Sequence, residues 1–175
     1  MAIEAINKTE LLDQIDEAVS QLIELMSTLE EDEVNSIPYA DSWTAGQLFQ
    51  HIRKSTEAMA QAMKKEGAPA DRDPGENIPI LKKTFLDFTT KLNAPEFIIP
   101  EETTYVKADI IQKLGASFQQ LRENAKSASD LTVVIKNLPI GDVTKWEILH
   151  FVLYHTQRHL QQMKKIHDAI RNRVE

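Results

Sequence analysis

The sequence predicts an all-α protein: four long helices packed as a four-helix bundle, with a short additional lateral helix. The chain has 175 residues, 42% of them apolar and 27% charged, which is the composition of a globular protein with a substantial core. It holds only 5 Gly and 7 Pro, and most of the Pro falls between residues 69 and 100. The long segments on either side show apolar residues every three or four positions, as on one face of a helix.

The first apolar pattern covers residues 9–32 and predicts a helix. Ser42 is the expected N-cap of a second helix that runs from about residue 44 to 66, because a serine side chain can accept a hydrogen bond from the first turn. Residues 66–79 read EGAPADRDPGENIP, where Gly, Pro and Asp crowd together without apolar periodicity, so we expect a loop there.

The second half of the chain predicts a short helix over residues 80–92, a long one over 107–128 and the longest over 143–171. Residues 131–140, LTVVIKNLPI, contain a β-branched run, but no partner strand is evident and we expect a loop. The Pro-rich middle of the chain separates helices that each need a packing partner, so we expect no domain boundary there. We therefore expect residues 1–175 to form a single bundle domain.

The histidines are the most informative residues for function. On a wheel of about 100° per residue, His155 and His159 fall on the apolar arc of the last helix, whereas His150 and Tyr154 fall roughly opposite. A spacing of four residues lets two imidazoles reach one metal ion, although such a pair also occurs on surfaces or as hydrogen-bonded core histidines. His51, at the edge of the apolar arc of the second helix, supplies a third ligand and completes a candidate site with open positions.

Other kinds of site are excluded or disfavoured. The chain has no Cys, which excludes disulfides, thiolate metal ligands and a protein thiol nucleophile. Thr156 follows His155, so the HExxH motif of zinc proteases is absent. The net charge of -7, without a basic stripe, argues against a nucleic-acid partner. We also expect no membrane partner and a cytoplasmic protein, because neither a signal peptide nor a long apolar run is present.

Three stretches together resemble the DinB-like (DinB/YfiT) superfamily: SWTAGQLFQHI (42–52), LNAPEFIIP (92–100) and YHTQRHLQQM (154–163). The last is similar to the family's HxxxHxxQ signature. The resemblance implies an up-down-down-up bundle, often dimeric, and places the metal ligands on the three histidines named above. It implies zinc or nickel as the ion. Gln162 matches the family's Gln, whereas Gln161 stands where many members have Gly.

The resemblance also implies a function, which is a metal-dependent thiol transferase that joins a low-molecular-weight thiol to a small electrophile. A metal-dependent hydrolase and a non-enzymatic, stress-related metal-binding module are the alternatives. The expected partners are a small-molecule substrate and a second copy of the chain in a homodimer. Near the histidines, Trp43 could shape a pocket or pack as a hydrophobic staple or plug between helices. Gln162 could orient an imidazole or be an exposed helix residue. Arg158 could hold an anionic substrate, or be solvated or at a dimer contact.

Overall fold

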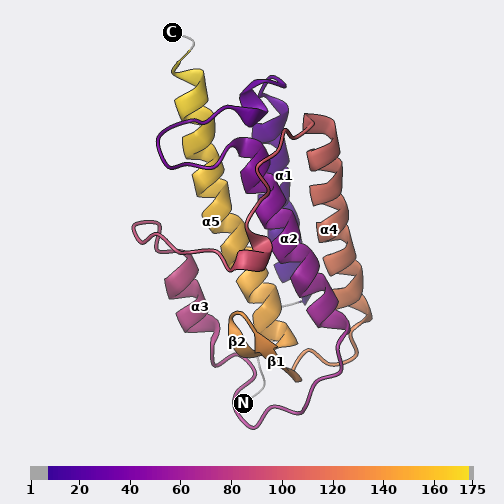
Figure 1. Cartoon of the computed structure of the whole chain (residues 1–175). Helices are drawn as coiled ribbons and strands as arrows, with labels where there is room; N and C mark the ends of the chain where they lie inside the picture. Colours follow the sequence, from indigo (N-terminus) through magenta and orange to yellow (C-terminus); the bar gives the residue numbers. More distant parts are fainter. Residues whose placement is uncertain (1–7, 174–175) are drawn as a thin grey trace.

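The computed structural model describes residues 8–173, and four long helices dominate it (Figure 1). In chain order the elements are α1 (Lys8–Ser27), the 3-10 helix η1 (Glu33–Asn35), α2 (Ala45–Lys64), α3 (Ile78–Phe85), the 3-10 helix η2 (Glu96–Ile98), α4 (Lys107–Ser127), β1 (Val134–Leu138), β2 (Gly141–Thr144) and α5 (Lys145–Arg171). The all-α prediction is confirmed. Helix α3 is the expected lateral helix, lying outside the bundle against α5. No helix among the described residues has the length and apolar character needed to cross a membrane.

Helices α2 and α4 run in the same direction. Near their beginnings, Gly46 approaches the ring of Tyr105, which stands just before α4. Near their ends, the Asn124 side chain of α4 donates a hydrogen bond to the Ala60 carbonyl of α2. Because α2 and α4 begin at the same end of the bundle and finish at the other, the long connection between them must return the chain along the whole bundle.

Helix α1 is antiparallel to α4 and parallel to α5. Arg122, near the end of α4, forms an ion pair of 2.6 Å with Asp16 in the first half of α1. Thr28, just after α1, hydrogen-bonds to His167 near the end of α5 at 2.9 Å. These pairings give the up-down-down-up arrangement that the family resemblance implies.

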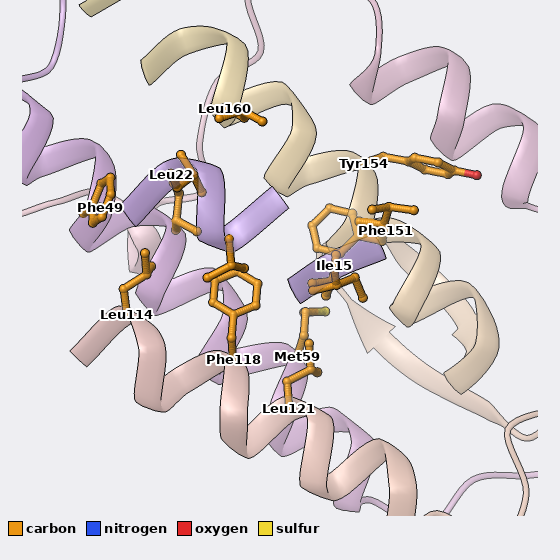
Figure 2. Packing of buried hydrophobic residues seen from close by; sticks show 14 of the residues in the cluster. Ile15, Leu22, Phe49, Met59, Leu114, Phe118, Leu121, Phe151, Tyr154 and Leu160 are labelled. Carbon is orange, nitrogen blue, oxygen red and sulfur yellow. The ribbon is translucent and has the colours of Figure 1, made fainter. Parts of the chain in front are cut away.

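The apolar faces of the four long helices meet in one core, which Figure 2 shows from close by. Leu22 of α1, Phe49 of α2, Leu114 of α4 and Ile148 of α5 are all fully buried in it. Burying a side chain of this size contributes about 1.5–3 kcal/mol. The three- and four-residue spacing of these positions is what keeps each apolar face directed inward along several turns.

The second helix begins with a capping box at Thr44 and not with the expected Ser42 cap. Gln47 N donates to Thr44 Oγ1 at 3.1 Å, and Thr44 N donates to Gln47 Oε1 at 3.0 Å. A capping box needs Gln or Glu three residues after the cap, and only Thr44 has one. This reciprocal pair fixes the first turn of α2, from which His51 projects one turn further on.

Three further predictions were wrong in detail. Helix α1 ends at Ser27 and α3 at Phe85, so both are shorter than their apolar patterns. The segment 131–140 is not a loop: it contains β1, which pairs antiparallel with β2, Ile135 standing opposite Val143. The partner strand lies so close to the start of the last helix that its residues were partly assigned to the helical pattern.

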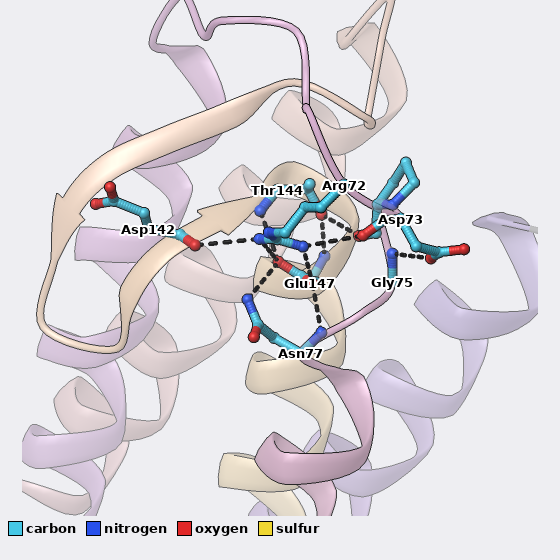
Figure 3. A network of polar contacts seen from close by, with 8 residues as sticks. Arg72, Asp73, Gly75, Asn77, Asp142, Thr144 and Glu147 are labelled. Atoms are coloured by element: carbon cyan, nitrogen blue, oxygen red, sulfur yellow. Dashed lines mark hydrogen bonds and ion pairs between the residues drawn. The ribbon is translucent and has the colours of Figure 1, made fainter.

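A buried carboxylate joins the beginning of α5 to the segment that leads into α3 (Figure 3). Glu147 has no exposed surface and receives 2.8 Å hydrogen bonds from the Arg72 guanidinium to both of its oxygens. Asn77 N and Thr144 N donate to it as well. Burial acts to raise the pKa of Glu147, but these hydrogen bonds outweigh it and hold the pKa below its ordinary value. The network therefore anchors α3 to α5.

Candidate metal centre

The fold brings the three predicted ligands together. His51 extends from α2 and His155 and His159 from α5, and all three are buried. Their Nε2 atoms lie 3.3 Å (His51–His155), 3.0 Å (His51–His159) and 3.1 Å (His155–His159) apart. One helix supplies two imidazoles one turn apart, and the neighbouring antiparallel helix supplies the third.

Two of the three imidazoles are held in a defined tautomer. His51 Nδ1–H donates to the Ile98 carbonyl oxygen at 3.0 Å, and a carbonyl can only accept. His159 Nδ1–H donates to Gln162 Oε1 at 2.9 Å. In the neutral form both Nε2 atoms therefore present lone pairs to each other, and a proton on His155 could bridge to only one of them.

A cation resolves this conflict. Within the described residues these three side chains form the one group of His, Cys, Asp and Glu whose ligand atoms lie close enough to share an ion. At about 2.1 Å from a common ion, two nitrogens are roughly 3.0 Å apart at a right angle and roughly 3.4 Å apart at the tetrahedral angle. The observed separations fit that range, so the cluster could hold a metal ion.

The electrostatics of the cluster favour neutral imidazoles. Burial lowers the pKa of His51, and the hydrogen bond to Ile98 only partly opposes the change. Burial, reinforced by the neighbouring His159, His51 and Arg158, lowers the pKa of His155 well below its ordinary value. Burial and the nearby His51 lower the pKa of His159 to about 3. Near neutral pH the nitrogen lone pairs are thus available for a metal ion.

The cluster opens onto a cavity of about 870 Å³. Aromatic rings line the cavity beside the histidines: Trp43 lies 4.9 Å from His51, and Phe151 lies 5.2 Å from His155, between ring centres. Phe85, at the end of the lateral helix, lies 6.1 Å from His155 and forms another part of the wall. Trp43 therefore forms part of the cavity wall, which is the first of the two roles expected for it.

Arg158 has a different role from either of those considered for it. Its guanidinium donates to the carbonyl oxygen of Phe85, at the end of α3, and to those of Asp87 (2.7 Å) and Thr90 in the segment that follows. The three bonds hold that segment over the cavity. Arg158 is thus partly buried and already occupied, which leaves little of it to bind an anionic substrate.

The other two histidines do not join the cluster. His150 and Tyr154 are buried, although the helical wheel places them roughly opposite the apolar arc. His150 Nδ1 lies 3.3 Å from the Tyr154 hydroxyl, the Trp146 ring packs edge-on against it, and burial lowers its pKa to about 4. The wheel failed because α5 is covered on several sides, so its less apolar face is also enclosed. His167 lies at the far end of α5.

The sequence did not predict one group that orients a histidine, the carbonyl oxygen of Ile98. It lies in η2, 47 residues beyond the histidine that it orients. The flanking Pro95 and Pro100 were the available signal, because they keep the segment out of a regular helix and leave its carbonyl groups free. Gln162, in contrast, does orient His159, which settles the choice between its two expected roles.

The fold and the site define a class of proteins: four-helix bundles of up-down-down-up topology in which two helices present three histidines beneath a cavity. The family model described as the DinB superfamily matches residues 14–163, and the chain belongs to that superfamily. The uncharacterized protein YuaE of Bacillus subtilis (strain 168) is similar, with 23% identity over 144 residues that cover 81% of this chain and 88% of YuaE. No solved structure gives a significant match.

Proposed function

We propose that the chain binds one divalent metal ion through His51, His155 and His159 and uses it to join a small external thiol to a small electrophile. The observation that carries the proposal is the convergence of three Nε2 atoms, 3.0–3.3 Å apart, beside a cavity. When bound, a divalent ion would lower the pKa of a thiol so that it reacts as a thiolate.

The protein's own groups would prepare that chemistry. The Ile98 carbonyl and Gln162 keep two imidazole lone pairs directed at one point, which spares the site a rearrangement when the ion enters. The aromatic rings of Trp43 and Phe151 reduce the access of water beside the ligands. The cavity, at about 870 Å³, is within the size range of small-molecule sites, so it has room for an external thiol and a second reactant.

The composition of the site favours an external thiol over hydrolysis. The chain contains no Cys, so any thiol nucleophile must come from solution. Hydrolysis by a metal-activated water benefits from a general base near the ion. Among the described residues that line the cavity, Asp41 is the one carboxylate, and Glu147 is engaged by Arg72 elsewhere.

The remaining parts of the proposal concern the ion and the setting of the protein. Imidazole nitrogens suit both zinc and nickel, and we propose one of these as the natural ion. We also propose a single domain over residues 1–175, a cytoplasmic location and a homodimer. Size-exclusion chromatography with light scattering tests the last of these.

Elemental analysis of protein purified without a nickel column tests the metal site. We expect about one equivalent of zinc or nickel in the wild type and in His167→Ala, a control histidine at the far end of α5. His51→Ala and His155→Ala should each lose most of it. A wild type without stoichiometric metal, or triad variants that retain it, would contradict the site.

Incubation with a model electrophile and a panel of small thiols tests the reaction. We expect product formation that requires both a thiol and the metal-loaded protein, and that His159→Ala abolishes. Consumption of the electrophile at the same rate without any thiol would refute the transferase and indicate hydrolysis. Inactivity with every thiol and electrophile, in protein that carries its metal, would instead favour a binding module.

A further inference from the structure

We propose that the cavity accepts a small molecule with an apolar body and one anionic group, and that Lys165 binds the anion. This inference rests on the proposed function only in taking the cavity beside the histidines as the substrate site. It names the chemical class of the substrate, which neither the family nor the triad specifies.

The apolar body follows from the mouth of the cavity. Several large apolar side chains are exposed at the surface, and four of them line this cavity. Their exposed fractions are 42% for Tyr39, 43% for Phe88, 37% for Leu92 and 54% for Phe97. Apolar groups gathered at one opening remain in contact with water unless a ligand covers them, and such patches commonly mark binding sites. Deeper in the cavity, Trp43 and Phe151 continue the apolar wall to the histidines.

The anionic group follows from the charges around the same opening. The whole chain has a formal net charge of -7. The cavity lining, in contrast, contains the cationic side chains of Lys91, Arg158 and Lys165 and the single carboxylate of Asp41. Arg158 is occupied by the carbonyl groups that it holds. Within residues 8–173 neither lysine forms an ion pair, so both ammonium groups are free to attract an anion.

The helix places Lys165 in register with the site. Along α5, His155, Arg158, Gln162 and Lys165 follow each other at steps of three, four and three residues, and therefore share one face. Lys165 is six residues beyond His159, which corresponds to about 9 Å along the helix axis. A ligand whose reactive end lies at the histidines would thus present its anionic group to Lys165 after an apolar span of that length.

Isothermal titration calorimetry with two matched probes tests the inference. The probes are 4-phenylbutyrate and the neutral 4-phenylbutanol, each titrated into zinc-loaded and into chelator-treated protein. We expect the carboxylate to bind about three- to fivefold more tightly than the alcohol in both forms, as for an exposed ion pair. Lys165→Ala should remove that preference, whereas Lys164→Ala, a neighbouring exposed lysine outside the cavity lining, should keep it.

The inference is overturned when neither probe binds, when both bind equally, or when Lys165→Ala behaves like Lys164→Ala. A carboxylate preference that disappears on metal removal would place the anion at the ion and not at Lys165. Failure of the proposed function gives a different pattern, because a protein without metal would still discriminate between the probes through Lys165.

Discussion

Two buried polar clusters lie on the same helix, and they differ in how their hydrogen bonds are satisfied. Around Glu147, near the start of α5, both carboxylate oxygens accept from donors, including the Arg72 guanidinium (Figure 3). Two turns further on, His155 and His159 meet His51 with nitrogen lone pairs that face one another. The hydrogen bonds of the first cluster are satisfied within the chain, whereas the second presents nitrogen lone pairs that could hold a cation.

This difference distinguishes a cluster that supports the fold from one that could bind an ion. Buried polar groups generally have partners, because an unpartnered one costs about 1–3 kcal/mol. The Glu147 cluster follows that rule and fastens the lateral helix to the bundle. The histidine cluster differs from it, because its facing lone pairs lie beside a cavity, where a cation could satisfy them.

The largest effect is expected from breaking the complete cluster. Glu147→Ala would remove the charged partner of the Arg72 guanidinium and the acceptor of the Asn77 and Thr144 backbone N–H groups. We expect a loss of about 2–4 kcal/mol in the free energy of unfolding. Urea denaturation measures it. Glu17→Gln, on the exposed face of α1, is the control and should change little. An equally small effect of Glu147→Ala would show that the network does not support the fold.

Removing the metal should act on the other cluster. An ion that binds only the folded state stabilises it by about 2.7 kcal/mol when its free concentration is a hundred times its Kd. For a chain of this size we expect a chelator to lower the Tm of the wild type by about 5–10 °C. The same treatment should leave the Tm of His155→Ala unchanged. A wild type indifferent to chelation would argue against bound metal.

The orientation of His159 by Gln162 should have a smaller effect. Gln162→Ala removes the acceptor for His159 Nδ1–H, and we expect metal affinity to fall about 10- to 100-fold with the fold intact. Competition with a chromogenic chelator measures the affinity. Gln161→Ala is a matched control, because Gln161 also lines the cavity but forms no hydrogen bond to His51, His155 or His159 in the described structure. Equal losses in both variants would exclude a specific orienting role.

The Glu147 cluster should also depend on pH. Because the pKa of Glu147 is held below its ordinary value of 4.5, its contribution is complete above that pH and is lost as the pH falls through the lowered pKa. At neutral pH we expect Glu147→Gln to be about 1–3 kcal/mol less stable than the wild type. Denaturation at a series of pH values should show this gap closing below about pH 4.5. A constant gap would assign the effect to packing.

The smallest effect is expected from His155→Leu in metal-free protein. The substitution removes an imidazole that can donate to only one of the two lone pairs facing it, so stability should change by less than about 1 kcal/mol or increase. Urea denaturation in the presence of a chelator measures it. A loss as large as that of Glu147→Ala would mean that the histidines support the fold by themselves, and the contrast between the clusters would fail.

The sequence alone determined the helical class and identified the three histidines that the fold brings together. Apolar spacing depends only on the geometry of a helix, so the buried faces and the inward positions of His155 and His159 could be read directly. The up-down-down-up order came from the resemblance to the family, and the structure confirms it. The single domain stays a prediction.

Only the tertiary structure decided the groups that complete the site. Ile98 orients a histidine 47 residues away, and Arg158 holds the segment after α3. Strand β1 pairs with β2, whose last residues the apolar pattern places in the final helix. The burial of His150 likewise depends on what covers α5. Local periodicity describes one element at a time, whereas these contacts form between elements, where long-range packing decides which polar group meets which partner.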